Sequence, residues 1–326
     1  MIVRKVLVTG GAGYVGSVVV RDLLRSGYEV KVIDSLLHGG NALLGFYADE
    51  NFEFVCGDIR DEKVVLSALS DVDAVVHLAA IVGDPACARQ PEESRTVNLE
   101  ASIRLFQISQ KQGINRFVFA STCSNYGKMA DPSQYVDENS ELRPVSLYAE
   151  HKVTVEKYLL DNSCYESTNT TILRLATAFG LSPRMRFDLT VNEFTMELLI
   201  NRTLMIYGEQ FWRPYVHVND IANAVKLVLG ESLEKTSGRV FNVGDNNQNY
   251  RKGEIVDLVR NVIDVECEIE FVTKEEDPRD YRVSFDRISR ELGFSIKKTV
   301  ESGIIEITDV INKGVITDFT NKYYRN

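Results

Sequence analysis

The feature that most constrains this chain is a glycine-rich turn near its start, Val6-Leu7-Val8-Thr9-Gly10-Gly11-Ala12-Gly13-Tyr14-Val15-Gly16. An apolar run typical of a buried strand meets glycines spaced GxxGxxG, and a helical pattern follows. Gly10 allows a sharp turn, Gly13 allows the backbone to approach a pyrophosphate, and Gly16 allows close helix–strand packing. The helix N-terminus then offers N–H groups to phosphates. The turn predicts a dinucleotide-binding βαβ unit.

An acidic residue follows the second expected strand. This strand covers residues 29–33 and ends at Asp34, whose carboxylate can accept hydrogen bonds from both hydroxyls of an adenosine ribose. Residues 35–37 contain no Arg or Lys, so a 2′-phosphate would be repelled by Asp34 and would find no cationic partner. The pattern therefore favours NAD over NADP.

Length and composition limit the class of protein. The 326 residues suffice for one large α/β domain or two closely joined ones. The net charge of −10 argues against nucleic acid or an anionic membrane surface as the main partner. The first five residues run directly into a strand and no apolar run is long enough to span a bilayer, so we expect neither a signal peptide nor a membrane segment.

The cysteines and histidines indicate no metal site and no disulfide framework. The five cysteines are odd in number, lack CxxC spacing and fit a reducing cytoplasm: Cys56, Cys87, Cys123, Cys164 and Cys267. The four histidines are well separated, and His77 and His217 lie in apolar strand patterns that favour a packed structural role.

Strand and helix patterns alternate along the chain. We expect strands at 3–8, 28–33, 52–56, 73–79, 116–121, 171–176 and 239–243, and helices at 14–26, 61–70, 94–112, 149–163 and 219–230. Residues 74–78 and 117–119 are apolar on both faces, as a parallel sheet covered by helices on each side requires. The predicted fold is an α/β, Rossmann-type doubly wound parallel sheet.

A second, smaller and discontinuous C-terminal domain is also expected. After about Gly180 the periodicity changes, and a polar loop precedes a helix at 190–201. Strand and helix patterns near 215–243 then return to the first domain. We predict a cofactor-binding domain at 1–180 plus 214–244 and a substrate-binding cap at 181–213 plus 245–326. Ligands should bind at the carboxyl ends of the strands, beneath this cap.

Tyr148 and Lys152 carry the candidate chemistry. They are four residues apart, so they project from one face of the helix that follows the fifth strand. An ammonium stabilises a phenolate, and lowering the pKa of Tyr148 from about 10 towards 7 takes roughly 4 kcal/mol, which Lys152 and a nicotinamide cation could supply. Such a tyrosine can take the proton of a carbinol while hydride leaves to NAD. A hydroxyl near the end of strand 116–121 can contact the same oxygen.

With these motifs in place, the chain resembles an extended short-chain dehydrogenase/reductase of the NAD-dependent nucleotide-sugar epimerase/dehydratase family, similar to UDP-glucose 4-epimerases. The resemblance covers nearly the whole chain and includes the glycine turn, Asp34, Asp58-Ile59, residues 77–80, Asn98, residues 121–127, Tyr148 with Lys152, and residues 213–220. It implies a nucleotide-diphosphate sugar as substrate and a homodimer formed through the helices at 94–112 and 149–163.

The resemblance also implies roles for individual residues. It places the catalytic hydroxyl on Thr122, with Ser121 and Ser124 as alternatives, beside catalytic Tyr148 and Lys152. It places cofactor contacts at Gly10, Gly13, Tyr14, Val15, Asp34, Asp58, Ile59, Leu78, Ala79, Ala80, Asn98, Tyr148 and Lys152, and substrate contacts at Ser124, Thr177, Arg213 and Arg282. Arg213 and Arg282 should clamp the diphosphate, with Arg184 and Arg279 as weaker candidates.

Departures from the family pattern narrow the reaction. Dehydratases of the family carry Asp-Glu directly after the catalytic Thr, and this chain has Cys123 and Ser124 there. Neither is a good acid or base for C5–H removal and C6–OH protonation. Thr177 replaces the usual Asn of a strand-end motif, which bears on the identity of the sugar. The resemblance implies C4 epimerisation, although the same residues would equally serve a 4-dehydrogenase or a 4-ketoreductase. A 4,6-dehydratase is a weaker alternative, and outside enzymes the alternative is a redox-sensing NAD-binding regulator.

Overall fold

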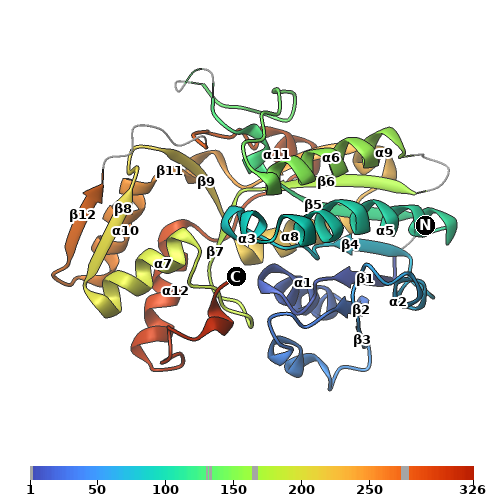
Figure 1. Ribbon diagram of the computed structural model, residues 1–326, viewed down its shortest axis with the longest axis horizontal. Coiled ribbons are helices and arrows are strands. Elements are labelled where there is room, and N and C mark those ends of the chain that lie inside the picture. The colour runs from blue at the N-terminus through green and yellow to red at the C-terminus, as the bar shows by residue number, and fades with distance from the viewer. Residues whose placement is uncertain (1–2, 130, 132–133, 164–167, 273–278) are drawn as a thin grey trace.

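Seven parallel strands form the centre of the structure, a computed structural model that describes residues 3–129, 131, 134–163, 168–272 and 279–326 (Figure 1). Their order is β10-β6-β5-β4-β1-β2-β3. The strands are β1 (Lys5–Thr9), β2 (Glu29–Asp34), β3 (Phe52–Cys56), β4 (Ala74–His77), β5 (Arg116–Thr122), β6 (Asn169–Leu175) and β10 (Arg239–Val243). This is the predicted doubly wound sheet, with strands at the predicted places.

Alternating side chains bury both faces of this sheet. In β1, Val6 and Val8 join a core beneath α1 (Tyr14–Arg25) and α8 (Val218–Gly230), whereas Leu7 joins a second core on the other face. That second core lies beneath α2 (Glu62–Ala68), α5 (Ser102–Lys111) and α6 (Leu147–Asp161). Because both faces are covered by helices, the strands are apolar on both sides, as the sequence predicted.

The remaining elements form a smaller part around two short sheets. β9 (Trp212–His217) pairs in parallel with β7 (Thr177–Phe179) and antiparallel with β11 (Asn249–Arg251), and β8 (Thr203–Tyr207) pairs with β12 (Glu268–Val272). Figure 1 shows β8 and β12 beside α10, at the far end from β3. Besides α8, the described helices of the chain's second half are α7 (Thr190–Met196), α9 (Leu233–Thr236), α10 (Lys252–Ile263), α11 (Asp286–Leu292) and α12 (Val300–Asn312).

Two expectations need correction. The helix predicted at 94–112 is not regular: α3 (Asp84–Arg89) and α4 (Pro91–Ser94) precede a π-helical stretch at Arg95–Ala101, and α5 follows. The strand near 215 joins β7 and β11 instead of the large sheet, although α8 and β10 do return to it. The proposed domain boundaries remain a prediction.

The described residues include four of the five cysteines and both histidines of the strand patterns. Cys56, Cys87, Cys123 and Cys267 are free thiols, and Cys164 lies outside the described residues. Among the described helices, none combines the length and apolar character that a membrane span requires. His77 and His217 are buried, and the imidazole of His77 hydrogen-bonds the hydroxyls of Thr9 and Ser102.

The order of the strands places a crevice at the centre of the sheet. From β1 the chain continues to β2 and β3 on one side of β1, and then crosses to β4 on its other side. The strand order therefore reverses between β1 and β4, which are neighbours at a topological switch point. In open α/β sheets ligands bind outside the carboxyl ends of the strands at such a point. The glycine turn follows β1 there, and residues 78–83 follow β4.

Candidate active site

The glycine turn has the geometry that its spacing predicts. Gly10 adopts a φ of +74°, and a Cβ on it would lie 2.8 Å from the backbone of Ala79. A Cβ on Gly16 would lie 2.0 Å from the Gly10 carbonyl oxygen, so only glycine allows α1 to start this close to β1. The turn therefore leaves a backbone-lined cradle at the N-terminus of α1, which fits a pyrophosphate.

Asp34 is fixed at the end of β2 beside this cradle. One carboxylate oxygen accepts a hydrogen bond from the Ala12 amide at 3.0 Å, and the other accepts from the Leu36 amide at 2.8 Å. Burial raises the pKa of Asp34, and these two amide hydrogen bonds partly offset that rise. Each oxygen keeps a further lone pair for a ribose hydroxyl.

A single cavity of about 730 Å³ follows the strand ends and holds most of the predicted residues. Its lining includes Gly10, Gly13, Tyr14, Val15, Asp34, Asp58, Ile59, Leu78, Ala79, Ala80, Thr122, Ser124, Tyr148, Lys152, Thr177 and Arg213. Within this lining, both carboxylate oxygens of Asp58 accept hydrogen bonds from the Arg60 guanidinium, so an adenine amino group would compete with this ion pair for the carboxylate. The volume lies within the range typical of cofactor sites.

Asn98 and Arg282 do not line the cavity among the described residues. Asn98 lies in the π-helical stretch and clamps the backbone of Ile81: its oxygen accepts from the Ile81 amide at 2.8 Å and its amide donates to the Ile81 carbonyl at 2.9 Å. It thus supports the cavity wall from behind. The Arg282 guanidinium lies 4.1 Å from the Tyr135 ring centre and 4.6 Å from that of Trp212.

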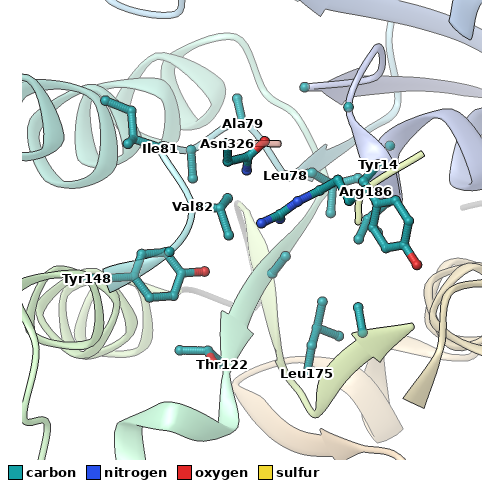
Figure 2. Close-up of a pocket in the computed structure, with 18 of the residues that line it drawn as sticks. Tyr14, Leu78, Ala79, Ile81, Val82, Thr122, Tyr148, Leu175, Arg186 and Asn326 are labelled. Atoms are coloured by element: carbon teal, nitrogen blue, oxygen red, sulfur yellow. The ribbon is translucent and has the colours of Figure 1, made fainter. Parts of the chain in front are cut away.

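The candidate catalytic residues converge on the cavity. Figure 2 shows the Tyr148 hydroxyl pointing into the open space between Val82 and Thr122. Lys152 is buried one helical turn further along α6, where its ammonium donates to the Ala120 carbonyl at 2.7 Å and lies 5.8 Å from the Tyr148 ring centre. Tyr148 and Thr122 therefore line the same part of the cavity, where the Thr122 hydroxyl also accepts a hydrogen bond from the Ser124 amide at 3.1 Å.

The pKa of Tyr148 differs from the sequence expectation. Burial raises it above the ordinary value, nearby Cys87 and Asp84 raise it further, and Arg186 lowers it. Burial also lowers the pKa of Lys152 from 10.5 to about 8. The expected lowering of the Tyr148 pKa is thus not a property of the protein alone, because removing the phenolate from water outweighs the nearby positive charge.

Three further arginines line the cavity: Arg184 and Arg279, which the sequence offered as weaker candidates, and Arg186, which it did not single out. Arg279 forms an ion pair with Asp84 at 2.7 Å and its carbonyl accepts a hydrogen bond from Arg213, so the two arginines lie together. Arg186 projects into the cavity in Figure 2 and pairs with Asp188 at 2.7 Å. The only sequence signal for Arg186 was the polar loop at 183–188.

The close contact at Gly16 predicts that adding a single methyl group there disturbs both the fold and NAD binding. Gly16→Ala should lower the free energy of unfolding by roughly 2–3 kcal/mol and abolish NAD binding, because its Cβ would overlap the Gly10 oxygen. Thermal unfolding and NAD titration test this. Gly45→Ala is the matched control, since a Cβ there meets no atom within 4 Å. Normal NAD affinity in Gly16→Ala would contradict the proposed cradle.

The position of the Asp34 carboxylate leads to a prediction about the preference for NAD over NADP. Asp34→Ala should weaken NAD binding by about 10- to 100-fold, because a charged group that accepts ribose hydrogen bonds contributes about 1.5–3 kcal/mol. NADP affinity should change less, since repulsion of a 2′-phosphate is removed at the same time. The readout is the ratio of the two dissociation constants, with exposed Glu50→Ala as control. An equal loss for NAD and NADP would show that Asp34 only supports the turn.

Comparison with known proteins agrees with this geometry. A family model described as the NAD dependent epimerase/dehydratase family matches residues 6–244. A dTDP-glucose 4,6-dehydratase from Streptomyces niveus is 29% identical and covers 94% of this chain and 92% of its own.

Two solved structures share the fold, each with a TM-score of 0.85 and 27% identity. One is the UDP-glucose 4-epimerase of Thermotoga maritima with UDP-glucose, covering 96% of this chain and 100% of its own. The other is the dTDP-glucose 4,6-dehydratase DesIV of Streptomyces venezuelae with NAD, covering 95% and 97%. The predicted fold, enzyme class and NAD cofactor are confirmed at this level. From the glycine turn to β10, this chain belongs to the NAD dependent epimerase/dehydratase family.

Proposed function

We propose that this protein epimerises a nucleotide-diphosphate sugar at C4 by reversible hydride transfer. The observation that carries the proposal is the convergence of the Tyr148 hydroxyl and Thr122 on one cavity, which the glycine turn and Asp34 also line. A base, a hydrogen-bonding hydroxyl and a dinucleotide site within one cavity are the parts that carbinol oxidation requires.

The proposed chemistry divides between cofactor and protein. When bound, NAD accepts the C4 hydride of the sugar and returns it to the opposite face of the ring. Tyr148 takes the O4 proton as the C4–H bond breaks and gives it back when the 4-keto sugar is reduced. Thr122 holds O4 in place, and the positive charge of Lys152 favours the phenolate.

The diphosphate lies near Arg213 in this proposal. Arg213 is buried and lines the cavity beside Arg279, so two guanidinium groups can face two phosphates. We therefore assign the second clamp position to Arg279, and a role for Arg282 rests on the resemblance alone. Ser124 and Thr177 line the cavity and would contact the sugar.

The residues after Thr122 support epimerisation over dehydration. The thiol of Cys123 is 1% exposed, donates to the Arg174 carbonyl, and has a pKa that burial raises well above the ordinary value. Ser124 contacts the Tyr281 hydroxyl at 3.3 Å and offers no carboxyl group. Removing the C5 proton and protonating the C6 hydroxyl would require an acid and a base that these two residues do not supply.

Product analysis tests the proposal against its alternatives. Purified protein is incubated with NAD and UDP-, GDP- or dTDP-sugars while NADH absorbance is followed and products are identified by NMR. Epimer without NADH accumulation supports the proposal. Accumulating NADH with a released keto sugar indicates a 4-dehydrogenase, a 4-keto-6-deoxy product indicates a dehydratase, and NAD binding without turnover indicates the redox-sensing regulator.

The proposal also covers the oligomeric state of the protein and its location in the cell. We propose a cytoplasmic homodimer that pairs α5 and α6 across a two-fold axis. Of the apolar residues that could form it, Phe106, Val153 and Leu159 are buried within the chain itself, whereas Leu99, Ile103 and Tyr158 are partly buried. Light scattering at micromolar concentration should give twice the chain mass, and a monomer would reject this part.

A further inference from the structure

Glu156 is a buried acid on the helix that carries Tyr148 and Lys152. It lies one further helical turn along α6 and is 1% exposed. Its carboxylate accepts a hydrogen bond from the Ser121 hydroxyl, from the Asn125 amide at 2.8 Å, and from the Arg174 guanidinium at 2.8 Å. The three donors come from the end of β5, from the turn after it, and from β6. One carboxylate thus joins three elements.

These contacts fix α6 against the strand that ends in Thr122. Lys152 binds the carbonyl of Ala120, and Glu156 binds the hydroxyl of Ser121, the next residue along β5. Thr122 follows directly. These two hydrogen bonds between α6 and β5 therefore set the separation between the Thr122 hydroxyl and the Tyr148 hydroxyl, which lies at the start of α6.

The partner of Glu156 extends this network to the sheet edge. The Arg174 guanidinium also donates to the Tyr126 hydroxyl at 3.0 Å, and this hydroxyl donates to Asn242 of β10 at 2.8 Å. The Arg174–Glu156 ion pair is almost fully buried, with 5% and 1% of the side chains exposed. A buried ion pair is often no more stabilising than apolar residues of similar volume, so stability alone does not account for it.

We propose that Glu156 is a positioning residue for the proposed C4 hydride transfer, and that with Arg174 it holds α6 where Tyr148 and Thr122 face the same sugar hydroxyl. The inference rests on the proposed function.

Glu156 also acts on Lys152 through space. The titratable groups near Lys152 are Tyr148 and Glu156 from α6, Cys87 from α3 and His77 from β4. Burial lowers the pKa of Lys152, and among these groups the charge of Glu156 opposes that effect most.

The test compares Glu156→Gln with the double variant Glu156→Gln/Arg174→Gln. The single variant leaves Arg174 without its counter-charge and should lower the unfolding midpoint, whereas the double variant should recover it. In both, kcat for the sugar should fall roughly 10- to 100-fold with little change in KM, because misplaced reacting groups slow the chemical step. Exposed Glu150→Gln on the same helix is the control and should match the wild type.

Two readouts separate positioning from mere structural support. Removing the carboxylate of Glu156 disfavours the charged form of Lys152, so the high-pH limb of the kcat profile in Glu156→Gln should move to lower pH. ¹⁵N NMR of the lysine Nζ should show the same direction without any turnover. Recovery of kcat together with stability in the double variant, or an unchanged pH profile and NMR titration, would overturn the proposal. Absence of turnover in the wild type would reject the proposed function, and the NMR titration would still test the effect of Glu156.

Discussion

Tyr148→Phe should lower kcat for the nucleotide sugar by about 10²- to 10⁴-fold and leave NAD binding unchanged. The variant removes only the hydroxyl that points into the cavity between Val82 and Thr122. Without it, no group on α6 accepts the O4 proton as hydride leaves C4. The glycine turn and Asp34, to which we assign the main cofactor contacts, lie on other elements and should keep their geometry.

Steady-state kinetics and NAD titration measure the two effects of Tyr148→Phe separately. The control is Tyr47→Phe, which removes a hydroxyl from an exposed ring outside the cavity lining and should not alter kcat. Wild-type turnover in Tyr148→Phe would assign the base to another residue. Joint loss of turnover and NAD binding would mean that the phenol supports the cofactor site instead.

Lys152→Met should abolish most turnover and also change how stability depends on pH. In the folded chain burial lowers the pKa of Lys152 to about 8, against 10.5 in an unfolded chain. Between these values the unfolded chain binds the proton and the folded chain does not, so the contribution of Lys152 to stability rises with pH from about 8 to about 10.5. Methionine fills similar space without a charge, so this contribution is lost in the variant.

Chemical denaturation across pH 7 to 11 measures this effect as a difference between two proteins. The wild type should gain roughly 2–4 kcal/mol relative to Lys152→Met over the window. Tyrosines whose pKa burial raises lose their protons near pH 10 in the unfolded chain only, and this effect cancels in the difference because both proteins contain them. Parallel stability curves for the two proteins would show that the ammonium is not buried in the folded chain.

The strands and the glycine turn of the proposed cofactor site could be predicted from the sequence because their signals are local. The strand, the three glycines and the next strand ending in Asp34 lie within thirty residues, and the steric demand at Gly16 comes from Gly10, six residues away. Tyr148 and Lys152 are likewise one helical turn apart. Patterns of this length specify both the backbone conformation and the side chains that share a face.

The contacts of the candidate substrate arginines could not be predicted from the sequence because they join distant segments. Arg279 pairs with Asp84, 195 positions away, and no spacing rule connects them. The stacking of Arg282 on Tyr135 and Trp212 depends equally on three separate segments. The π-helical stretch around Asn98 and the raised pKa of Tyr148 escaped prediction for a related reason, since both depend on tertiary packing and not on spacing in the chain.

The most direct test of the account follows the C4 hydrogen. A nucleotide sugar deuterated at C4, in the UDP, GDP and dTDP forms, is incubated with the protein and NAD, and the products are examined by NMR. The account predicts a primary isotope effect on turnover and an epimer that retains deuterium at C4, because the same hydride leaves and returns. Loss of the label to solvent, or an epimer formed without an isotope effect in single-turnover measurements, would contradict hydride transfer at C4.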